Sequence, residues 1–270
     1  MVTSAQMEKS GSSAGTAESP PDRSPFFRWL QTNRHKLNDF ASNYSTIPND
    51  PVLAPELFPW AAELAAEWET IRDEALSIYR HKDAIPPIRE ISPDHKGIVA
   101  DDSWRSFFLV GYRNEVPENI ARAPRTAELV RRIPNLNSAF FSILAPGAHL
   151  SRHRGVAKAL ITAHLGLVIP TRSHDCRMEV DDQMLNWKPG GWTIFDDTYE
   201  HEVWNDTDEA RIILLCQVDR PLRAPASWLA AALMAYIRHS PFVSDVKRRM
   251  ADWEVIFADA EERVDLEAAK

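Results

Sequence analysis

Three side chains in the second half of the sequence are of the types that bind a metal ion and a carboxylate. His153 and His201 stand in His-Arg-Gly and His-Glu-Val triplets, and Arg211 follows ten residues after the second histidine. Imidazoles from two different segments can bind one side of a non-haem metal and leave its other positions open for small molecules. Spacing alone leaves open the alternative that both histidines are ordinary core or surface residues.

A regular alternation of apolar and polar residues adds a further candidate. In residues 160–168 the odd positions are apolar and face one side of a predicted strand, whereas Thr162 and His164 face the other side. Arg211 begins the partly polar face of residues 211–218 in the same way. Because an isolated buried charge is very costly, an arginine that points into a fold needs an anionic partner, and a bound carboxylate fits that role.

The segment that carries these residues is a block of short strands. The predicted strands cover residues 139–144, 160–169, 176–180, 192–195, 201–204 and 211–218. They are rich in β-branched and aromatic residues, and turns that contain Pro, Gly, Asn or Asp separate them. Many short strands at this spacing predict a sandwich or barrel of the jelly-roll kind.

Helices are predicted on both sides of the strand block. Helical periodicity covers residues 26–40, a longer helix that begins near Pro59, and residues 124–133, 226–238 and 243–257. A separate strand is predicted at residues 104–112. The order of helices, strands and helices, with no internal repeat, predicts an α+β protein with a mainly β core.

Composition limits the classes of partner. The chain has 270 residues, 44% of them hydrophobic, and a formal charge of −8 without a run of Lys or Arg, so a nucleic acid partner is not expected. The longest apolar stretch, residues 228–237, is about half of the roughly 20 residues that cross a bilayer, and no signal core is present. These features predict a cytoplasmic protein without a transmembrane segment. Cys176 and Cys216 are predicted to be reduced, buried thiols.

Ordered motifs around the candidate residues resemble a known family. Residues 144–155 read LAPGAHLSRHRG, residues 164–170 read HLGLVIP, and residues 195–205 read FDDTYEHEVWN. Together with Trp187, a following Gly-Gly pair and Arg211, they make residues 60–221 similar to the aspartyl/asparaginyl β-hydroxylase family. The resemblance implies a double-stranded β-helix (jelly roll, cupin-like) with flanking N- and C-terminal helices, and a dioxygenase that uses iron(II), 2-oxoglutarate and dioxygen.

The resemblance also assigns roles to individual positions. His153 and His201 stand at the positions of the family's iron ligands. Arg211 and Ser142 stand where the distal carboxylate of 2-oxoglutarate is held, and His164 stands where the carboxylate nearer the metal is bound. The implied reaction hydroxylates an unactivated C–H bond and releases succinate and CO2.

Two positions near the implied metal distinguish this chain from other oxygenases. Gly155 stands where most related oxygenases carry a carboxylate ligand, which this family lacks, and Thr162 stands where members that act on aspartyl side chains have an arginine. Asp196 and Asp197 are expected to fix the turn before His201 or to orient a ligand. Four basic residues that could replace the missing arginine are expected to be solvated instead: Arg105, Arg152, Arg154 and Lys158.

The expected organisation is a disordered tail at residues 1–25, an oxygenase domain at 26–221 and a C-terminal helical extension at 222–270. The expected substrate is an aspartyl or asparaginyl residue, or another amino-acid, peptide or carrier-bound group, hydroxylated at the β-carbon. One alternative is a lipid A-type acyl-chain hydroxylase, whose C-terminal helices could make peripheral membrane contact; Gly155 and the absence of membrane-anchoring ends count against it. Another is a non-catalytic jelly-roll binding module. The sequence leaves the oligomeric state open.

Overall fold

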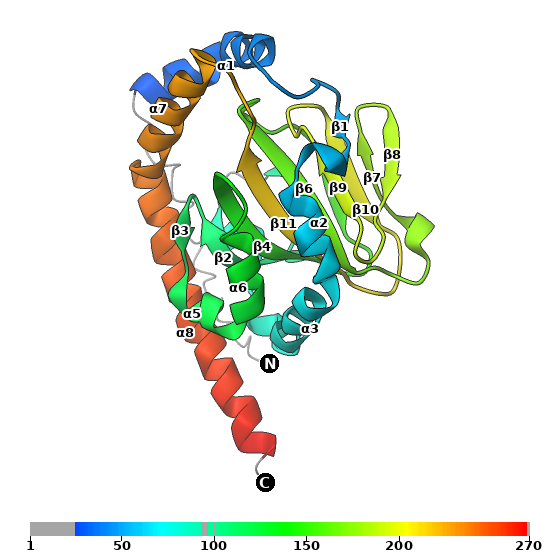
Figure 1. Ribbon diagram of the computed structural model, residues 1–270. Helices are drawn as coiled ribbons and strands as arrows, with labels where there is room; N and C mark the ends of the chain where they lie inside the picture. Colours follow the sequence, from blue (N-terminus) through cyan, green and yellow to red (C-terminus); the bar gives the residue numbers. More distant parts are fainter. Residues whose placement is uncertain (1–24, 93–94, 96, 100, 269–270) are drawn as a thin grey trace, which may run out of the picture.

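Two antiparallel β-sheets face each other in the computed structural model, which describes residues 25–268 except 93–94, 96 and 100 (Figure 1). The seven-stranded sheet has the order β1 (Val52–Leu53), β9 (Trp192–Phe195), β6 (Leu160–Val168), β11 (Arg211–Asp219), β4 (Leu136–Leu144), β2 (Trp104–Gly111), β3 (Asn114–Glu115). The four-stranded sheet has the order β5 (His149–His153), β10 (His201–Asn205), β7 (Cys176–Val180), β8 (Gln183–Asn186). This is the predicted jelly roll. Of the tail predicted to be disordered, residues 1–24 lie outside the described residues.

Strand alternation divides the apolar residues into two cores. On β11, Leu214 and Cys216 belong to the core between the larger sheet and the helices, while Ile213 belongs to the core between the two sheets. Met178 and Val203 of the smaller sheet complete the second core. The predicted faces of β6 and β11 are therefore confirmed, and the face that carries Arg211 lies inside the sandwich.

Helices cover the outer face of the larger sheet. They are α2 (Trp60–Ala66), α3 (Trp68–Tyr79), α5 (Pro117–Arg122) and α6 (Pro124–Val130), with short 3-10 turns at η1 (Pro55–Leu57) and η2 (Lys82–Ala84). A further 3-10 turn, η4 (Ser173–Asp175), contacts β7 of the smaller sheet. The single long helix predicted from Pro59 is wrong, because Glu67 leaves the helical region (φ −106°, ψ 11°). The break lets Trp68 begin a new helix with its indole against Gly190, whose φ of +70° is the left-handed turn conformation that glycine allows.

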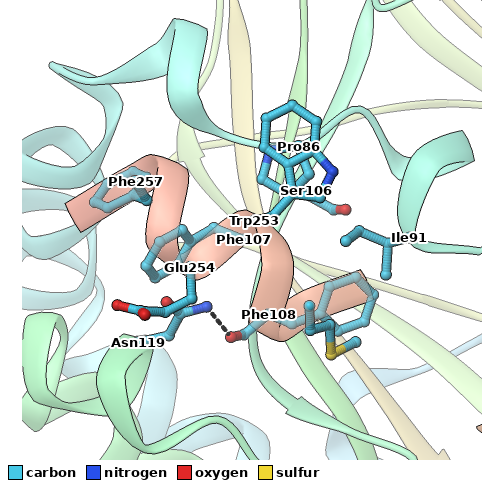
Figure 2. Close-up of a pocket in the computed structure, with 10 residues that line it drawn as sticks. Pro86, Ile91, Ser106, Phe107, Phe108, Asn119, Trp253, Glu254 and Phe257 are labelled. Atoms are coloured by element: carbon cyan, nitrogen blue, oxygen red, sulfur yellow. Dashed lines mark hydrogen bonds between the residues drawn. The ribbon is translucent and has the colours of Figure 1, made fainter. Parts of the chain in front are cut away.

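The remaining helices lie along one side of the sandwich. They are α1 (Pro25–Asn43), α4 (Ile88–Ile91), α7 (Ala226–Arg238) and α8 (Pro241–Ala268). Helix α8 is longer than predicted and is held by Arg122, whose guanidinium pairs with Glu254 at 3.1 Å and Glu261 at 2.7 Å. Figure 2 shows a small cavity beneath α8, where Trp253 and Phe257 meet strand β2. Helix α8 is therefore a packed part of the fold rather than a loose end.

Two strands of the smaller sheet were missed by the sequence pattern. Strand β5 has mostly exposed or half-buried side chains, and β8 is exposed or half-buried throughout, so neither shows an apolar run. Strand β5 forms because its backbone pairs with β10 and because its Arg152 pairs with Glu179 of β7 at 2.7 Å and with Glu202 of β10 at 3.2 Å.

No helix in the described part of the chain is long and apolar enough to span a membrane.

Candidate active site

The two candidate metal-binding histidines lie side by side on neighbouring strands. His153 of β5 is directly opposite His201 of β10, and their ring centroids are 4.1 Å apart. An irregularity in the pairing gives β5 one extra residue, since Val203 pairs with Leu150 instead of Ser151. Such a bulge redirects a side chain, and here it turns His153 and Leu150 to the same inner face although they are three residues apart.

Hydrogen bonds fix the tautomer of both rings. The Nδ1 atom of His153 lies 2.7 Å from the Ser151 carbonyl, and Nδ1 of His201 lies 3.0 Å from the Tyr199 carbonyl. Because a carbonyl only accepts, each Nδ1 carries the proton and each Nε2 keeps a free lone pair. Burial and the neighbouring imidazole lower the pKa of His153 to about 4, and burial also lowers the pKa of His201. Both rings are therefore neutral at pH 7, the state in which imidazole binds metals.

Arg211 is a buried cation without a protein counter-ion. Its residue is 2% exposed, its guanidinium lies 4.7 Å from the centre of the Trp187 ring, and its Nε atom has no hydrogen-bond partner. Among the residues that the structure describes, no carboxylate forms an ion pair with it. Burial lowers its pKa to about 10, so the side chain still carries its charge at pH 7. A buried, unpaired guanidinium of this kind has the chemistry to bind an anion.

Aromatic side chains connect the histidine pair to this arginine. The ring of Phe195 lies 5.3 Å from His201 and 5.1 Å from His164. The Trp187 indole donates a hydrogen bond of 3.3 Å to Nδ1 of His164, which leaves the proton of His164 on Nε2. Burial, together with the charge of Arg211, keeps the pKa of His164 well below its ordinary value. His164 is thus a neutral hydrogen-bond donor inside the sandwich.

Ser142 completes the set of predicted residues. It lies on β4 opposite Ile213, on the same inner face of the sheet as Arg211, and is 1% exposed. Its hydroxyl oxygen accepts a hydrogen bond of 3.0 Å from the Trp104 indole. The hydroxyl proton therefore remains available for an acceptor in the interior of the sandwich. All five predicted site residues stand on strands whose inner faces meet in this region.

A carboxylate occupies the space beside Gly155. A Cβ atom at this position would lie 2.2 Å from Oδ1 of Asp197, so no larger residue fits without displacing that carboxylate. The other oxygen of Asp197 accepts a hydrogen bond of 3.1 Å from Thr162. Burial, and then the charge of Asp196, raise the pKa of Asp197 to about 7. Thr162, for which the family resemblance implies an arginine in aspartyl-directed members, thus binds Asp197.

Asp196 has the predicted structural role in the turn before His201. Its Oδ1 atom accepts hydrogen bonds from the amide of Thr198 at 3.1 Å and from its hydroxyl at 2.5 Å. Its other oxygen pairs with Lys158 at 2.6 Å and with Arg220. The expectation that Lys158 is solvated is wrong: it is 6% exposed, because the loop after His153 folds over this carboxylate.

Other residues singled out in the sequence lie outside the site. Arg152 and Arg154 pair with surface glutamates, and Arg105 donates to the carbonyl of Ile85. Trp187 is buried; its indole donates a hydrogen bond to His164 and its ring contacts Arg211. Its position just before the Gly-Gly turn was the signal that could have identified it.

A family model described as aspartyl/asparaginyl beta-hydroxylase matches residues 65–221, which is more than half of the chain and includes every site residue above. The chain belongs to the aspartyl/asparaginyl β-hydroxylase family. The protein is a hydroxylase, as are the two relatives described in the next paragraph.

Two curated relatives differ in how much of their length corresponds to this hydroxylase. An ornithine lipid ester-linked acyl 2-hydroxylase of Rhizobium tropici is 36% identical over 257 residues, which cover 94% of this chain and 90% of that protein. The aspartyl/asparaginyl beta-hydroxylase of Homo sapiens is 29% identical over 217 residues, 74% of this chain but only 27% of that protein. The present chain therefore corresponds to about a quarter of the human relative and to most of the bacterial one.

Solved structures with partial similarity include cupin domains. The match with the Cupin_2 domain of an XRE family transcriptional regulator from Enterobacter cloacae covers 43% of this chain and 96% of that domain's chain, at 16% sequence identity and a TM-score of 0.30.

Within the described ranges, no third His, Cys, Asp or Glu side chain joins the two histidines in a group that could hold a metal.

Proposed function

We propose that this hydroxylase depends on iron(II) and 2-oxoglutarate, with His153 and His201 as the protein ligands of the metal and with Arg211, Ser142 and His164 as the binding site of the oxo-acid. The observation that carries the proposal is the buried guanidinium of Arg211, which has no carboxylate partner among the described residues and is joined by aromatic side chains to two neutral imidazoles. An oxo-acid that binds a metal at one end and ends in a carboxylate at the other suits this arrangement.

The donor set fits such a metal. Imidazole nitrogens are suitable ligands for iron(II), and two of them leave positions open for an oxo-acid and dioxygen. Both Nε2 lone pairs are available, because each Nδ1–H is held by a carbonyl, the kind of support that metal-binding histidines usually have.

When bound, the iron centre supplies activation of dioxygen, which converts a C–H group of the substrate into C–OH while 2-oxoglutarate becomes succinate and CO2. The protein positions the reactants. Arg211 would hold the distal carboxylate through charge-assisted hydrogen bonds, and Ser142 would donate its hydroxyl proton to the same group. His164 donates from Nε2 to the carboxylate nearer the metal. The rings of Phe195 and Trp187 lie beside His164, His201 and Arg211 and would exclude water from this region.

For the substrate we propose the acyl chain of an amino-acid-containing lipid, hydroxylated at its second carbon. Support comes from the bacterial acyl 2-hydroxylase, whose similarity extends over 94% of the chain and thus into helices outside residues 65–221. Thr162 supports it too, since this side chain is engaged with Asp197 and offers no charge to an aspartyl substrate. The aspartyl or asparaginyl side chain is the second candidate, supported by the human relative.

The test begins with an anaerobic titration of the protein with iron(II) and 2-oxoglutarate, followed by the visible charge-transfer band of the complex. The band is expected in the wild type, absent in His153→Ala and His201→Ala, and shifted to far higher oxo-acid concentrations in Arg211→Ala. Arg154→Ala, which alters an exposed arginine, is the matched control. A folded, iron-loaded wild type without the band would refute the proposed cofactors.

The substrate is tested with isotopically labelled dioxygen. Incorporation of labelled oxygen into an ester-linked acyl chain of an ornithine lipid, but not into an aspartyl peptide, is the expected result. Incorporation into the peptide alone would refute the lipid substrate and leave the proposed cofactors standing.

A further inference from the structure

Helix α7 exposes apolar side chains where a surface helix normally exposes polar ones. Only Ala226 of its thirteen residues is buried. Trp228 is 72% exposed, Leu229 is 46% exposed and Tyr236 is 39% exposed. Since Trp228 and Tyr236 are eight residues apart, they lie along one stripe of the helix. A helix with an apolar exposed side is covered by another surface in its working state.

The neighbouring helix α1 extends this surface. It packs against α7, as the upper left of Figure 1 shows, and its Trp29 is 51% exposed. Residues 25–38 and 221–244 contain no acidic residue, although the whole chain carries a charge of −8. Their basic residues are Arg28, Arg34, Lys36, Arg223 and Arg238. Exposed tryptophan and leucine with surrounding Arg and Lys are the features of a helix that lies in a bilayer interface.

Helix α1 also contacts the loop that follows His153. The Asn38 side chain of α1 accepts a hydrogen bond of 2.9 Å from the amide of Lys158 and donates one of 3.4 Å to the carbonyl of Val156. Both residues belong to the loop that follows His153, and Val156 is itself 66% exposed. A surface bound by α1 therefore lies next to the loop that leaves the histidine pair.

We propose that this interfacial face, formed by the exposed sides of α1 and α7 with Val156, binds the surface of an anionic lipid bilayer. Helix α7 then lies in the plane of the interface, since no described helix could cross a membrane. The choice of a lipid surface rests in part on the acyl-lipid substrate proposed above. Bilayer contact presents that substrate beside the loop after His153, so the lipid does not have to leave the membrane through water.

Two other occupants of the interfacial face are disfavoured. Residues 1–24 contain only Met1, Val2 and Met7 as large apolar residues, too few to cover the tryptophans of two helices. A second copy of the chain, packed through the same face, would bring together the basic residues of both copies. Anionic headgroups neutralise these charges.

The experiment is sedimentation of the full-length protein with vesicles, without iron, 2-oxoglutarate or substrate. The wild type is expected to bind vesicles of phosphatidylglycerol and phosphatidylcholine, to bind vesicles of pure phosphatidylcholine weakly, and to dissociate as salt is added. Trp228→Ser combined with Leu229→Ser is expected to weaken binding about tenfold or more. Arg34→Glu combined with Lys36→Glu is expected to abolish the preference for the anionic lipid while the fold, followed by circular dichroism, is unchanged.

A matched control is Val255→Ser on α8, which removes an apolar side chain that is 60% exposed next to Glu254. It is expected to bind like the wild type. Equal binding of the Trp228/Leu229 variant and the wild type, or no binding of the wild type, would overturn the proposal. A wild-type dimer that these substitutions convert to a monomer would overturn it too, in favour of a second copy. Because the assay needs no turnover, its result is independent of the proposed reaction.

Discussion

Replacement of Arg211 by methionine is expected to stabilise the protein without ligands and to abolish its stabilisation by the oxo-acid. Burial lowers the pKa of Arg211 from its ordinary 12.5 to about 10, a difference that corresponds to about 3 kcal/mol against the charged state. The variant loses the contact between the guanidinium and the Trp187 ring, which stabilises by up to about 2 kcal/mol when desolvated. Methionine keeps most of the apolar stem, so the net gain is about 1 kcal/mol.

Thermal unfolding measures both halves of this prediction. In the presence of a chelator, Arg211→Met is expected to melt roughly 2–4 °C above the wild type. Under anaerobic conditions with iron(II), 2-oxoglutarate at a hundred times its dissociation constant is expected to stabilise the wild type by about 2.7 kcal/mol and the variant hardly at all. The order of the two melting temperatures is therefore expected to reverse when the oxo-acid is added.

The control is Arg154→Met, at an exposed arginine that pairs with Glu200, where a change within about 0.5 kcal/mol is expected in either condition. A ligand-free Arg211→Met protein that is less stable than the wild type would refute the reasoning, because it would show that the guanidinium is already compensated within the protein. Equal stabilisation of both proteins by 2-oxoglutarate would refute the role of Arg211 as its anion-binding residue.

Three further predictions concern other parts of the site and core. Gly155→Ala is expected to cost about 1–3 kcal/mol in urea unfolding, because its Cβ would displace the buried Asp197 carboxylate; an unchanged free energy of unfolding would contradict this. Burial raises the pKa of Cys176 and Cys216, so neither thiol is expected to react with a thiol reagent in the native protein, and both are expected to react after unfolding. Fast labelling of the native protein would contradict their burial. The pKa of His153 is lowered to about 4, so as the pH falls below 6.5 this histidine takes up a proton in the unfolded metal-free chain before it does so in the folded protein. The free energy of unfolding is therefore expected to decrease from pH 6.5 towards pH 4. A flat profile would contradict neutral burial of the histidine.

Most of the long strands could be predicted because the residues on their buried faces are apolar and recur at every second position. Strands β6 and β11 have one fully apolar face, and this apolar periodicity alone predicts that Thr162, His164 and Arg211 lie on the opposite face. Strand β5 gave no such signal, since its side chains are mostly exposed and it exists through pairing with β10. The break between α2 and α3 was missed for a related reason: an apolar stripe continues through Glu67, and only packing against the sheet bends the chain there.

The sequence by itself determined the types of the site residues and the family to which the ordered motifs belong, because residue chemistry and motif order are local properties of the chain. Tertiary structure decided how those residues meet. The bulge in β5 turns His153 inward, Asp197 fills the space beside Gly155, and Lys158 is buried against Asp196 although it was expected in solvent. Each of these depends on contacts between segments far apart in the sequence, and neither composition nor periodicity contains that information.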